Sequence, residues 1–238
     1  MPQEPLQESI SIVIPTVNEA ENIEPLVAQI MTAMPGVREI LFVDDRSNDG
    51  TPGEICSLAA AAPVRLVERE IPTLGLSGAV ITGARAACGD ILVVMDADLS
   101  HPPEKIPDLL QPIVIGRADM AIGSRYIPGG TTPDWPLYRK AMSRVAAATA
   151  YPLTGVHDSM CGFFAIRRVL LLELAPRATG FKIAFEAIVR GGRSLRIVEV
   201  PIEFRDRRRG KSKMSLGVAI LFGFRWIAAA GRILLRRR

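Results

Sequence analysis

The sequence contains very few of the residues that bind transition metals through nitrogen or sulfur. Among its 238 residues there are two histidines and three cysteines. A metal site built from several histidines is therefore excluded, and the spacings of Cys56, Cys88 and Cys161 match no zinc-binding pattern. An odd number of cysteines fits free thiols in a reducing compartment better than it fits a disulfide framework.

Aromatic residues and long apolar runs are also scarce. Aromatic residues make up 5% of the chain and hydrophobic residues 48%, so we expect one sizeable domain with a mostly aliphatic core. The first eleven residues are polar, and they lack the basic start and apolar run of a secretory signal. The longest uncharged run near the C-terminus, residues 214–224, has eleven residues, whereas a bilayer span needs roughly 20.

Charge is distributed unevenly along the chain. Residues 205–238 contain eleven Lys or Arg and one acid, which leaves 18 bases and 24 acids in the rest. Such a basic tail is typical of a segment that meets an anionic partner, either a lipid surface or a nucleic acid; a merely solvated C-terminus is the alternative. The basic run 205–213 contains no aromatic residue for stacking on bases, so we expect no nucleic-acid partner.

The pattern of residues 214–238 predicts an amphipathic helix. On a helix Arg225, Arg232 and Arg236 fall on one side, against apolar residues such as Phe224 and Trp226. Such a helix lies in the headgroup plane of a membrane rather than across it. Two alternatives stay open: a helix packed on the protein's own core, and the start of a membrane segment in a longer natural protein.

Apolar runs that predict buried strands alternate with segments that predict helices. This order favours an α/β fold with a mostly parallel sheet covered by helices on both faces. Asn18 is the expected cap of the first helix, and the Gly- and Pro-rich loop 128–136 is a candidate lid. We expect strands at 11–15, 39–43, 64–67, 91–95, 119–123, 163–166 and 195–200, and helices that include 18–33, 104–114 and 137–150.

Acidic pairs follow two of these strands. Asp44 and Asp45 follow the second strand, and Asp96 and Asp98 follow the fourth. Ligands of parallel α/β sheets bind outside the carboxyl ends of the strands. In extended chain residues i and i+2 project to the same side, so Asp96 and Asp98 can face one hard cation together with phosphate oxygens. The alternative for both pairs is helix capping or turn chemistry.

Six motifs occur in an order that resembles a known family. They are Ile-Pro-Thr-Val-Asn-Glu (14–19), Val-Asp-Asp-Arg-Ser-Asn-Asp-Gly-Thr (43–51), Asp-Ala-Asp-Leu-Ser-His-Pro-Pro-Glu (96–104), Gly-Ser-Arg-Tyr (123–126), Asp-Ser-Met-Cys-Gly-Phe (158–163) and Val-Pro-Ile-Glu-Phe-Arg-Asp-Arg-Arg-Arg-Gly-Lys-Ser-Lys-Met (200–214). The chain resembles the family-2 glycosyltransferases with a GT-A fold, and most closely the dolichyl- or polyprenyl-phosphate mannosyltransferases.

The resemblance implies a role for particular residues. It implies a nucleotide pocket lined by Pro15, Glu19, Val43, Asp44 and Asp45. It implies that a Mg²⁺ or Mn²⁺ ion and the donor diphosphate are held by Asp96 and Asp98, with Ala97 contributing backbone. It implies that phosphates of donor and acceptor are bound by Arg125, Arg207 and Lys213, with Arg139 as a further candidate, and that Asp158 lies near the reacting sugar.

The reaction implied is transfer of mannose from GDP-mannose to a polyprenyl phosphate, with inversion at the anomeric carbon. Transfer from a UDP-sugar, such as glucose or an amino sugar, is the alternative, because Val17 and Ser100 stand where the family often has Tyr and Gln. A lipid phosphate is largely a dianion at pH 7 and needs no strong base. His101 and His157 are therefore expected to be structural.

The expected organisation is a catalytic domain at 1–213 followed by a membrane-associating tail at 214–238. This arrangement places the protein on the cytoplasmic face of a membrane, where the head group of the acceptor lies. No sequence pattern indicates an oligomeric state. An inactive lipid-binding scaffold is the non-enzymatic alternative, and it predicts that Asp98→Ala has no effect on function.

Overall fold

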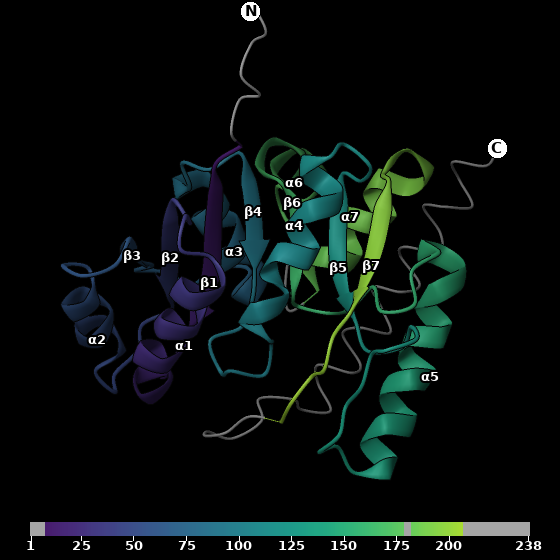
Figure 1. Ribbon diagram of the computed structural model, residues 1–238, viewed down its shortest axis with the longest axis horizontal. Helices are drawn as coiled ribbons and strands as arrows, with labels where there is room; N and C mark the ends of the chain where they lie inside the picture. Colours follow the sequence, from purple (N-terminus) through teal and green to yellow (C-terminus); the bar gives the residue numbers. More distant parts are fainter. Residues whose placement is uncertain (1–7, 179–181, 207–238) are drawn as a thin grey trace, which may run out of the picture.

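A seven-stranded sheet forms the centre of the computed structural model, which describes residues 8–178 and 182–206 (Figure 1). The strands lie in the order β3-β2-β1-β4-β6-β5-β7. Their bounds are β1 Ile10–Thr16, β2 Glu39–Asp44, β3 Val64–Glu68, β4 Ile91–Val94, β5 Met120–Ser124, β6 Phe164–Arg167 and β7 Ile197–Pro201. Each of these strands overlaps a strand predicted from the sequence, because strands inside an α/β sheet consist of consecutive apolar residues.

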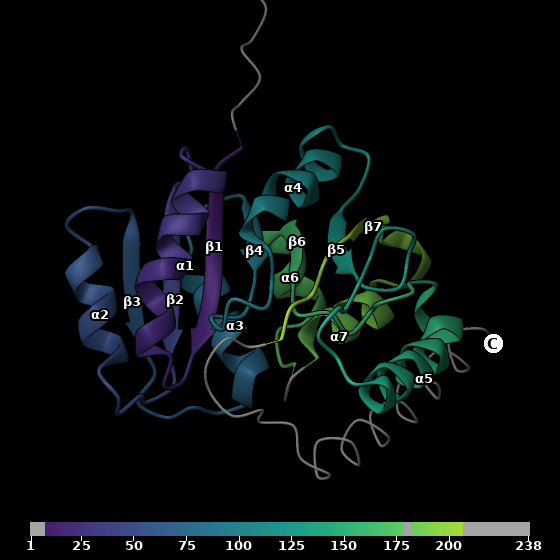
Figure 2. The same ribbon diagram turned by 60° about the horizontal axis from the view of Figure 1, so that its bottom comes forward.

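Helices flank the sheet, with α1 on one face and α3 on the other (Figures 1 and 2). Their bounds are α1 Ala20–Ala33, α2 Thr51–Leu58, α3 Gly75–Ala86, α4 Ile106–Val114, α5 Leu137–Thr154, α6 Arg168–Leu174 and α7 Ile183–Gly191, with short 3₁₀ turns at Pro103–Lys105 and Gly192–Ser194. Close packing of α3 depends on Gly83, where an added Cβ would lie 2.4 Å from Cγ1 of Val13 in β1. The covered strands form the core, and every residue of β2 is buried.

One strand, β6, runs antiparallel to both of its neighbours, β4 and β5. Phe164 at its start pairs with Val94 on one side and with Ile122 on the other. The backbone N–H of Gly123 also donates to the carbonyl of Phe163, at 2.8 Å. The reversed direction therefore brings the segment before β6 to the edge where β4 and β5 end.

The first helix begins differently from the prediction. Asn18 was expected to cap it, but α1 starts at Ala20, and Asn18 has a left-handed backbone with φ of 55°. Its side-chain oxygen instead accepts from the N–H of Asn48 at 2.9 Å. The cap comes from the next loop, since a carboxylate oxygen of Asp49 accepts the N–H of Ala20 at 3.1 Å. The loops after β1 and β2 are thereby joined.

Helix α5 is the least buried of the long helices. It packs on α7, where Ala150 contacts Phe185 and Val189, and only Ala147 and Ala150 of its residues are buried. Figures 1 and 2 show it extending beyond the sheet, on the side where the parallel strands end. Among the described residues, no helix combines the length and the apolar character that a bilayer crossing requires.

Candidate active site

Strained backbone marks one edge of the sheet. Within residues 8–178 and 182–206, four residues other than glycine have positive φ: Asn18, Arg46, Leu74 and Leu99, with values from 55° to 65°. They lie in the loops that follow β1, β2, β3 and β4 respectively. Such conformations cost free energy and cluster at active sites. The carboxyl edge of the parallel strands is therefore where we look for the site.

The residues predicted to bind the nucleotide meet at the ends of β1 and β2. Pro15 and Val43 pair directly across the two strands. Glu19 follows β1, and its backbone N–H donates to Oγ1 of Thr51 at 2.9 Å. The structure brings these predicted residues together. Contact with a nucleotide stays a prediction.

The two acids after β2 have protein partners. Buried Asp44 accepts hydrogen bonds from the hydroxyl of Thr16 at 3.2 Å and from the hydroxyl and N–H of Ser47 at 2.5 and 2.8 Å. Asp45 accepts two bonds from Nη1 of Arg69, at 2.8 and 3.1 Å. Burial raises the pKa of Asp45 above its ordinary value, and the charge of Arg69 opposes that rise. Asp44 thus shapes the loop, and Asp45 is the more accessible of the pair.

The Asp-Ala-Asp triplet does not lie in extended chain, which corrects the geometry expected from the sequence. Strand β4 ends at Val94, and a bend follows in which Leu99 is left-handed. The side chain of Asp96 is 36% exposed, whereas Asp98 is buried and its Oδ1 accepts the N–H of Ser100 at 3.1 Å and its hydroxyl at 2.5 Å. Asp96 thus presents the accessible carboxylate, and Asp98 also shapes the turn.

A buried histidine supports this bend. The backbone N–H of Asp96 donates to Nδ1 of His101 at 3.0 Å, so the ring carries its proton on Nε2. His101 stacks on Phe163 with ring centroids 5.3 Å apart. Burial lowers the pKa of His101 below its ordinary value, although the nearby carboxylates oppose this. A neutral, packed imidazole agrees with the structural role expected for it.

Arg125 and Asp158 form a buried ion pair at the end of β5. Nε of Arg125 donates to Oδ2 at 2.7 Å, Nη2 donates to Oδ1 at 2.8 Å, and the backbone N–H of Arg125 donates to Oδ2 at 3.0 Å. Burial opposes the charge of Arg125, but the bonds and charge of Asp158 raise its pKa above the ordinary value. Asp158 is fully buried. It fixes the guanidinium in place, and its predicted position near the sugar stays a prediction.

Aromatic rings surround that guanidinium. Arg125 lies 5.3 Å from the ring centroids of Tyr126, Trp135 and Phe204. Arg139 lies 4.0 Å from the ring of Trp135 and pairs with Asp206 at 3.0 Å. The structure therefore brings Arg139 to the group around Arg125. The other predicted cations, Arg207 and Lys213, lie outside the described residues.

The expected lid, residues 128–136, is anchored rather than free. The N–H of Thr131 donates to the carbonyl of Ile202 at 3.0 Å, and the N–H of Phe204 donates to the carbonyl of Thr131 at 2.9 Å. Trp135 is buried against Arg125, and its Nε1 has no hydrogen-bond partner among the described residues. In this structure the loop is a wall of the site.

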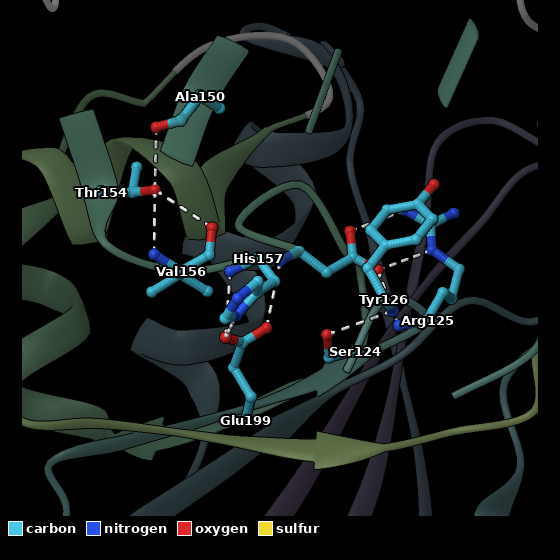
Figure 3. A network of polar contacts seen from close by, with 9 residues as sticks. Ser124, Arg125, Tyr126, Ala150, Thr154, Val156, His157 and Glu199 are labelled. Atoms are coloured by element: carbon cyan, nitrogen blue, oxygen red, sulfur yellow. Dashed lines mark hydrogen bonds and ion pairs between the residues drawn. The ribbon is translucent and has the colours of Figure 1, made fainter. Parts of the chain in front are cut away.

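Two residues near the site were not predicted. Glu199 of β7 accepts the backbone N–H groups of His157 and Asp158 at 2.9 and 3.1 Å, and it lies 2.7 Å from Nδ1 of His157 (Figure 3). The sequence did contain a signal for Glu199, because a carboxylate inside a strand is unusual. Lys182 donates to the carbonyl of Met160 at 3.2 Å, and burial lowers its pKa. Lys182 lies in no motif, so nothing in the sequence pointed to it.

A cavity of about 710 Å³ opens beside the ion pair. Its cationic lining comes from Arg125 and from Arg144 of α5. The remaining lining is mostly apolar or aromatic and comes from Tyr126, Ile127, Pro128, Gly129, Gly130, Ala147, Ala148, Tyr151 and His157. Cations beside an apolar wall suit a ligand with an anionic head and a hydrocarbon body.

The arrangement matches a known family. Residues 11–175 match the model described as glycosyl transferase family 2, which is more than half of the chain. The chain belongs to this family. This match confirms both the resemblance and the enzyme class, glycosyltransferase, that the six motifs predicted.

Two relatives share most of the domain. The chain is 44% identical over 210 residues to a dolichol-phosphate mannosyltransferase of Pyrococcus furiosus, covering 86% of this chain and 59% of that protein. It is 40% identical over 217 residues to a polyprenol monophosphomannose synthase of Mycolicibacterium smegmatis, covering 86% of this chain and 80% of that one. The chain thus spans less than two thirds of the length of the Pyrococcus relative.

A solved structure confirms the fold. Glucosyl-3-phosphoglycerate synthase of Mycobacterium tuberculosis, crystallised with Mn²⁺, UDP and glucosyl-3-phosphoglycerate, is 25% identical with a TM-score of 0.71. The match covers 94% of this chain and 79% of the crystallised one. The mostly parallel GT-A sheet flanked by helices is therefore confirmed. The predicted C-terminal amphipathic helix, residues 214–238, lies outside the described residues.

Proposed function

We propose that this glycosyltransferase moves mannose from GDP-mannose to the phosphate of a polyprenyl lipid and inverts the anomeric configuration. The observation that carries the proposal is the placement of an accessible carboxylate, Asp96, and a fixed guanidinium, Arg125, at one sheet edge, with the amphiphilic cavity beside Arg125. The names of the two relatives, a dolichol-phosphate mannosyltransferase and a polyprenol monophosphomannose synthase, support the same sugar and lipid class.

The donor would bind along the ends of β1, β2 and β4. Hard oxygen ligands with room for phosphate oxygens suit Mg²⁺ or Mn²⁺, and Asp96 and Asp98 would hold such an ion. When bound, the ion would neutralise charge on the departing diphosphate. The carboxylate of Asp96, which is 36% exposed, is a hard oxygen ligand that such an ion can reach. Within the described residues no cluster of three or more His, Cys, Asp and Glu could hold a metal. The Mn²⁺ of the mycobacterial synthase supports a divalent metal.

The acceptor phosphate would lie beside Arg125 in the cavity. One of its oxygens forms the bond to the anomeric carbon, while the bond from that carbon to the donor phosphate breaks and the nucleoside diphosphate leaves with the electron pair. A phosphate dianion needs no proton removed, and neutral His101 is not required as a base. Because Asp158 already holds the guanidinium of Arg125 in place, this side chain does not have to reorient when the charged acceptor phosphate binds.

The remaining predictions complete the proposal. Arg207 and Lys213 would add cations from the chain beyond the described residues, and Arg139 would assist from α5. The catalytic domain would end at residue 213, and the basic tail 214–238 would lie on a membrane at its cytoplasmic face. The tail carries the excess of positive charge that anionic lipid attracts.

A second candidate is transfer from a UDP-sugar to the same acceptor. It is favoured by the structural similarity to a synthase crystallised with UDP and by Val17 and Ser100, where the family often has other residues. Both candidates use the same catalytic edge and differ in the donor that is consumed.

The test is incubation of the full chain with Mg²⁺ or Mn²⁺, a polyprenyl phosphate and either GDP-mannose or UDP-glucose. We expect lipid-linked mannose with β configuration from GDP-mannose, and we expect none from an Asp96→Asn, Asp98→Asn double variant. Consumption of UDP-sugars alone would establish the second candidate. No product with any donor and metal would refute both.

A further inference from the structure

We propose that Glu199 is a positioning residue for the transfer, one that fixes the guanidinium of Arg125 through the backbone of Asp158. Glu199 lies in β7, and its register partner in the neighbouring strand β5 is Ile122, shortly before Arg125. A turn from a third part of the chain, residues 157–160, connects the two. The role in transfer rests on the proposed function, whereas the fixing of the guanidinium does not.

The carboxylate of Glu199 accepts hydrogen bonds with both of its oxygens. Oε2 accepts the backbone N–H of His157 at 2.9 Å, and Oε1 accepts the backbone N–H of Asp158 at 3.1 Å (Figure 3). The side chain of Glu199 is 14% exposed. Hydrogen bonds to an ionised acceptor are stronger than neutral ones, and shielding from water strengthens them further. Glu199 therefore holds the start of the turn against β7.

The far end of the turn is held by other groups. The N–H of Cys161 donates to the carbonyl of Asp158 at 3.1 Å, and Nζ of Lys182 donates to the carbonyl of Met160 at 3.2 Å. These bonds maintain the shape of the turn, but they leave its first N–H groups to Glu199. The placement of Asp158 relative to the sheet therefore depends on Glu199.

The placement of Asp158 in turn determines the placement of Arg125. Its carboxylate lies on a short side chain, so the two oxygens that accept Nε and Nη2 of Arg125 at 2.7 and 2.8 Å move with the backbone. Aromatic rings also surround the guanidinium, but a ring face attracts a cation without fixing its direction. In enzymes a misplacement of about 1 Å can cost roughly a hundredfold in rate.

The ring of His157 offers an alternative route from Glu199 to the acceptor. Oε2 of Glu199 lies 2.7 Å from Nδ1 of His157, and this histidine lines the cavity beside Arg125. The side chain of His157 is 51% exposed, whereas Asp158 is fully buried. Because water weakens polar contacts at an exposed ring, we infer that the backbone route is the stronger one.

A graded pair of variants at position 199 tests the proposal. Glu199→Met fills a similar volume but offers no oxygen to the two backbone N–H groups, whereas Glu199→Gln keeps one oxygen. We expect the KM for polyprenyl phosphate to rise by roughly tenfold in Glu199→Met and by less in Glu199→Gln, with the KM of the consumed donor, GDP-mannose or UDP-glucose, unchanged. If Glu199→Met does not fold, Glu199→Gln decides. An unchanged acceptor KM would overturn the proposal.

Glu39 provides a matched control for loss of stability. It is another carboxylate in a strand, 6% exposed, and it accepts the backbone N–H of Cys88 and the hydroxyl of Ser11, both at 2.6 Å. Glu39 begins β2, at the edge of the sheet opposite the site. Glu39→Met should therefore lower the Tm and leave the acceptor KM unchanged. A similar rise in the acceptor KM would show that destabilisation alone produces the effect, which would also overturn the proposal.

A second background distinguishes the backbone route from the imidazole route. His157→Ala removes the ring and keeps the backbone N–H that Glu199 accepts. In this background Glu199→Met should raise the acceptor KM by the same factor as it does in the natural sequence, because independent effects multiply. A rise that requires the imidazole would assign the effect to the ring and overturn the proposal.

A spectroscopic readout separates this proposal from the proposed function. The Nε–H of Arg125 donates to buried Asp158, and its NMR signal, assigned by its loss in Arg125→Lys, is recorded for the full chain without donor or acceptor. Its exchange with water should be roughly tenfold faster in Glu199→Met and unchanged in Glu39→Met. Unaltered exchange in Glu199→Met would overturn the proposal. Faster exchange in a protein that transfers sugar from no donor would refute the proposed function and leave the positioning intact.

Discussion

Replacing Asp158 with asparagine should destabilise the whole domain, because it breaks an ion pair that is almost entirely buried. The carboxylate is fully buried, and Arg125 beside it has a side chain only 11% exposed. Three N–H groups of Arg125 donate hydrogen bonds to the two carboxylate oxygens of Asp158. Asparagine offers one oxygen and one NH₂ group, so at least one donor of Arg125 would face another donor.

The magnitude follows from the burial. Removing one partner of a buried ion pair costs about 3–5 kcal/mol, because the other charge is left uncompensated. Since asparagine keeps one acceptor, we expect the lower end, about 3 kcal/mol of unfolding free energy. For a domain of this size that corresponds to a Tm lower by roughly 6–12 °C. Urea unfolding followed by circular dichroism measures the first quantity, and calorimetry measures the second.

The chain contains its own control. Asp119 accepts the same three kinds of bond from Arg196: its backbone N–H and Nε at 3.0 Å, and Nη2 at 2.7 Å. The side chain of Arg196 is 57% exposed, so water can solvate the charge that loses its carboxylate partner in Asp119→Asn. We expect a clearly smaller loss of stability for that variant. Equal losses for the two variants would show that burial does not set the strength of the Arg125 pair.

Three further predictions concern single groups. Burial raises the pKa of the Cys161 thiol to about 12, so iodoacetamide at pH 8 should label exposed Cys56 and Cys88 but reach Cys161 only after unfolding, as mass spectrometry would show. Burial lowers the pKa of His101 from 6.5, so as the pH falls the unfolded chain takes up this proton before the folded chain does. The free energy of unfolding should therefore fall as the pH drops below 6.5, by at most about 1.4 kcal/mol per pH unit. In His101→Asn it should fall less steeply. Asp98→Asn should reduce turnover with Mn²⁺ by roughly a hundredfold, whereas unchanged turnover would show that Asp98 does not take part in catalysis.

The sequence was sufficient for the sheet but not for the direction of every strand. Each of the seven strands was predicted within about two residues, because apolar runs between polar loops mark buried strands. Nothing in those runs distinguishes β6 from its neighbours, since periodicity carries no information about direction. The reversal determines the site, because it brings Asp158 to Arg125.

The site was predicted as a set of residues rather than as a geometry. Motif order identified the edge that contains Asp96 and Arg125, but the bend after β4 and the burial of Asp98 depend on packing around His101. Glu199 had a readable signal as a carboxylate in a strand. Lys182 had none, because its position near the ion pair arises only from the folded chain.

The reversed strand also determines when the site can form during synthesis. The strands β3, β2, β1 and β4 come from residues 10–94, and the next strand in the sheet, β6, ends at residue 167. Chains are made from the N-terminus, and the early part of a protein can begin to fold first. The acids that would bind a nucleotide sugar therefore emerge from the ribosome before Asp158, which secures Arg125. A nascent chain could thus encounter its donor before the cation for its acceptor is fixed.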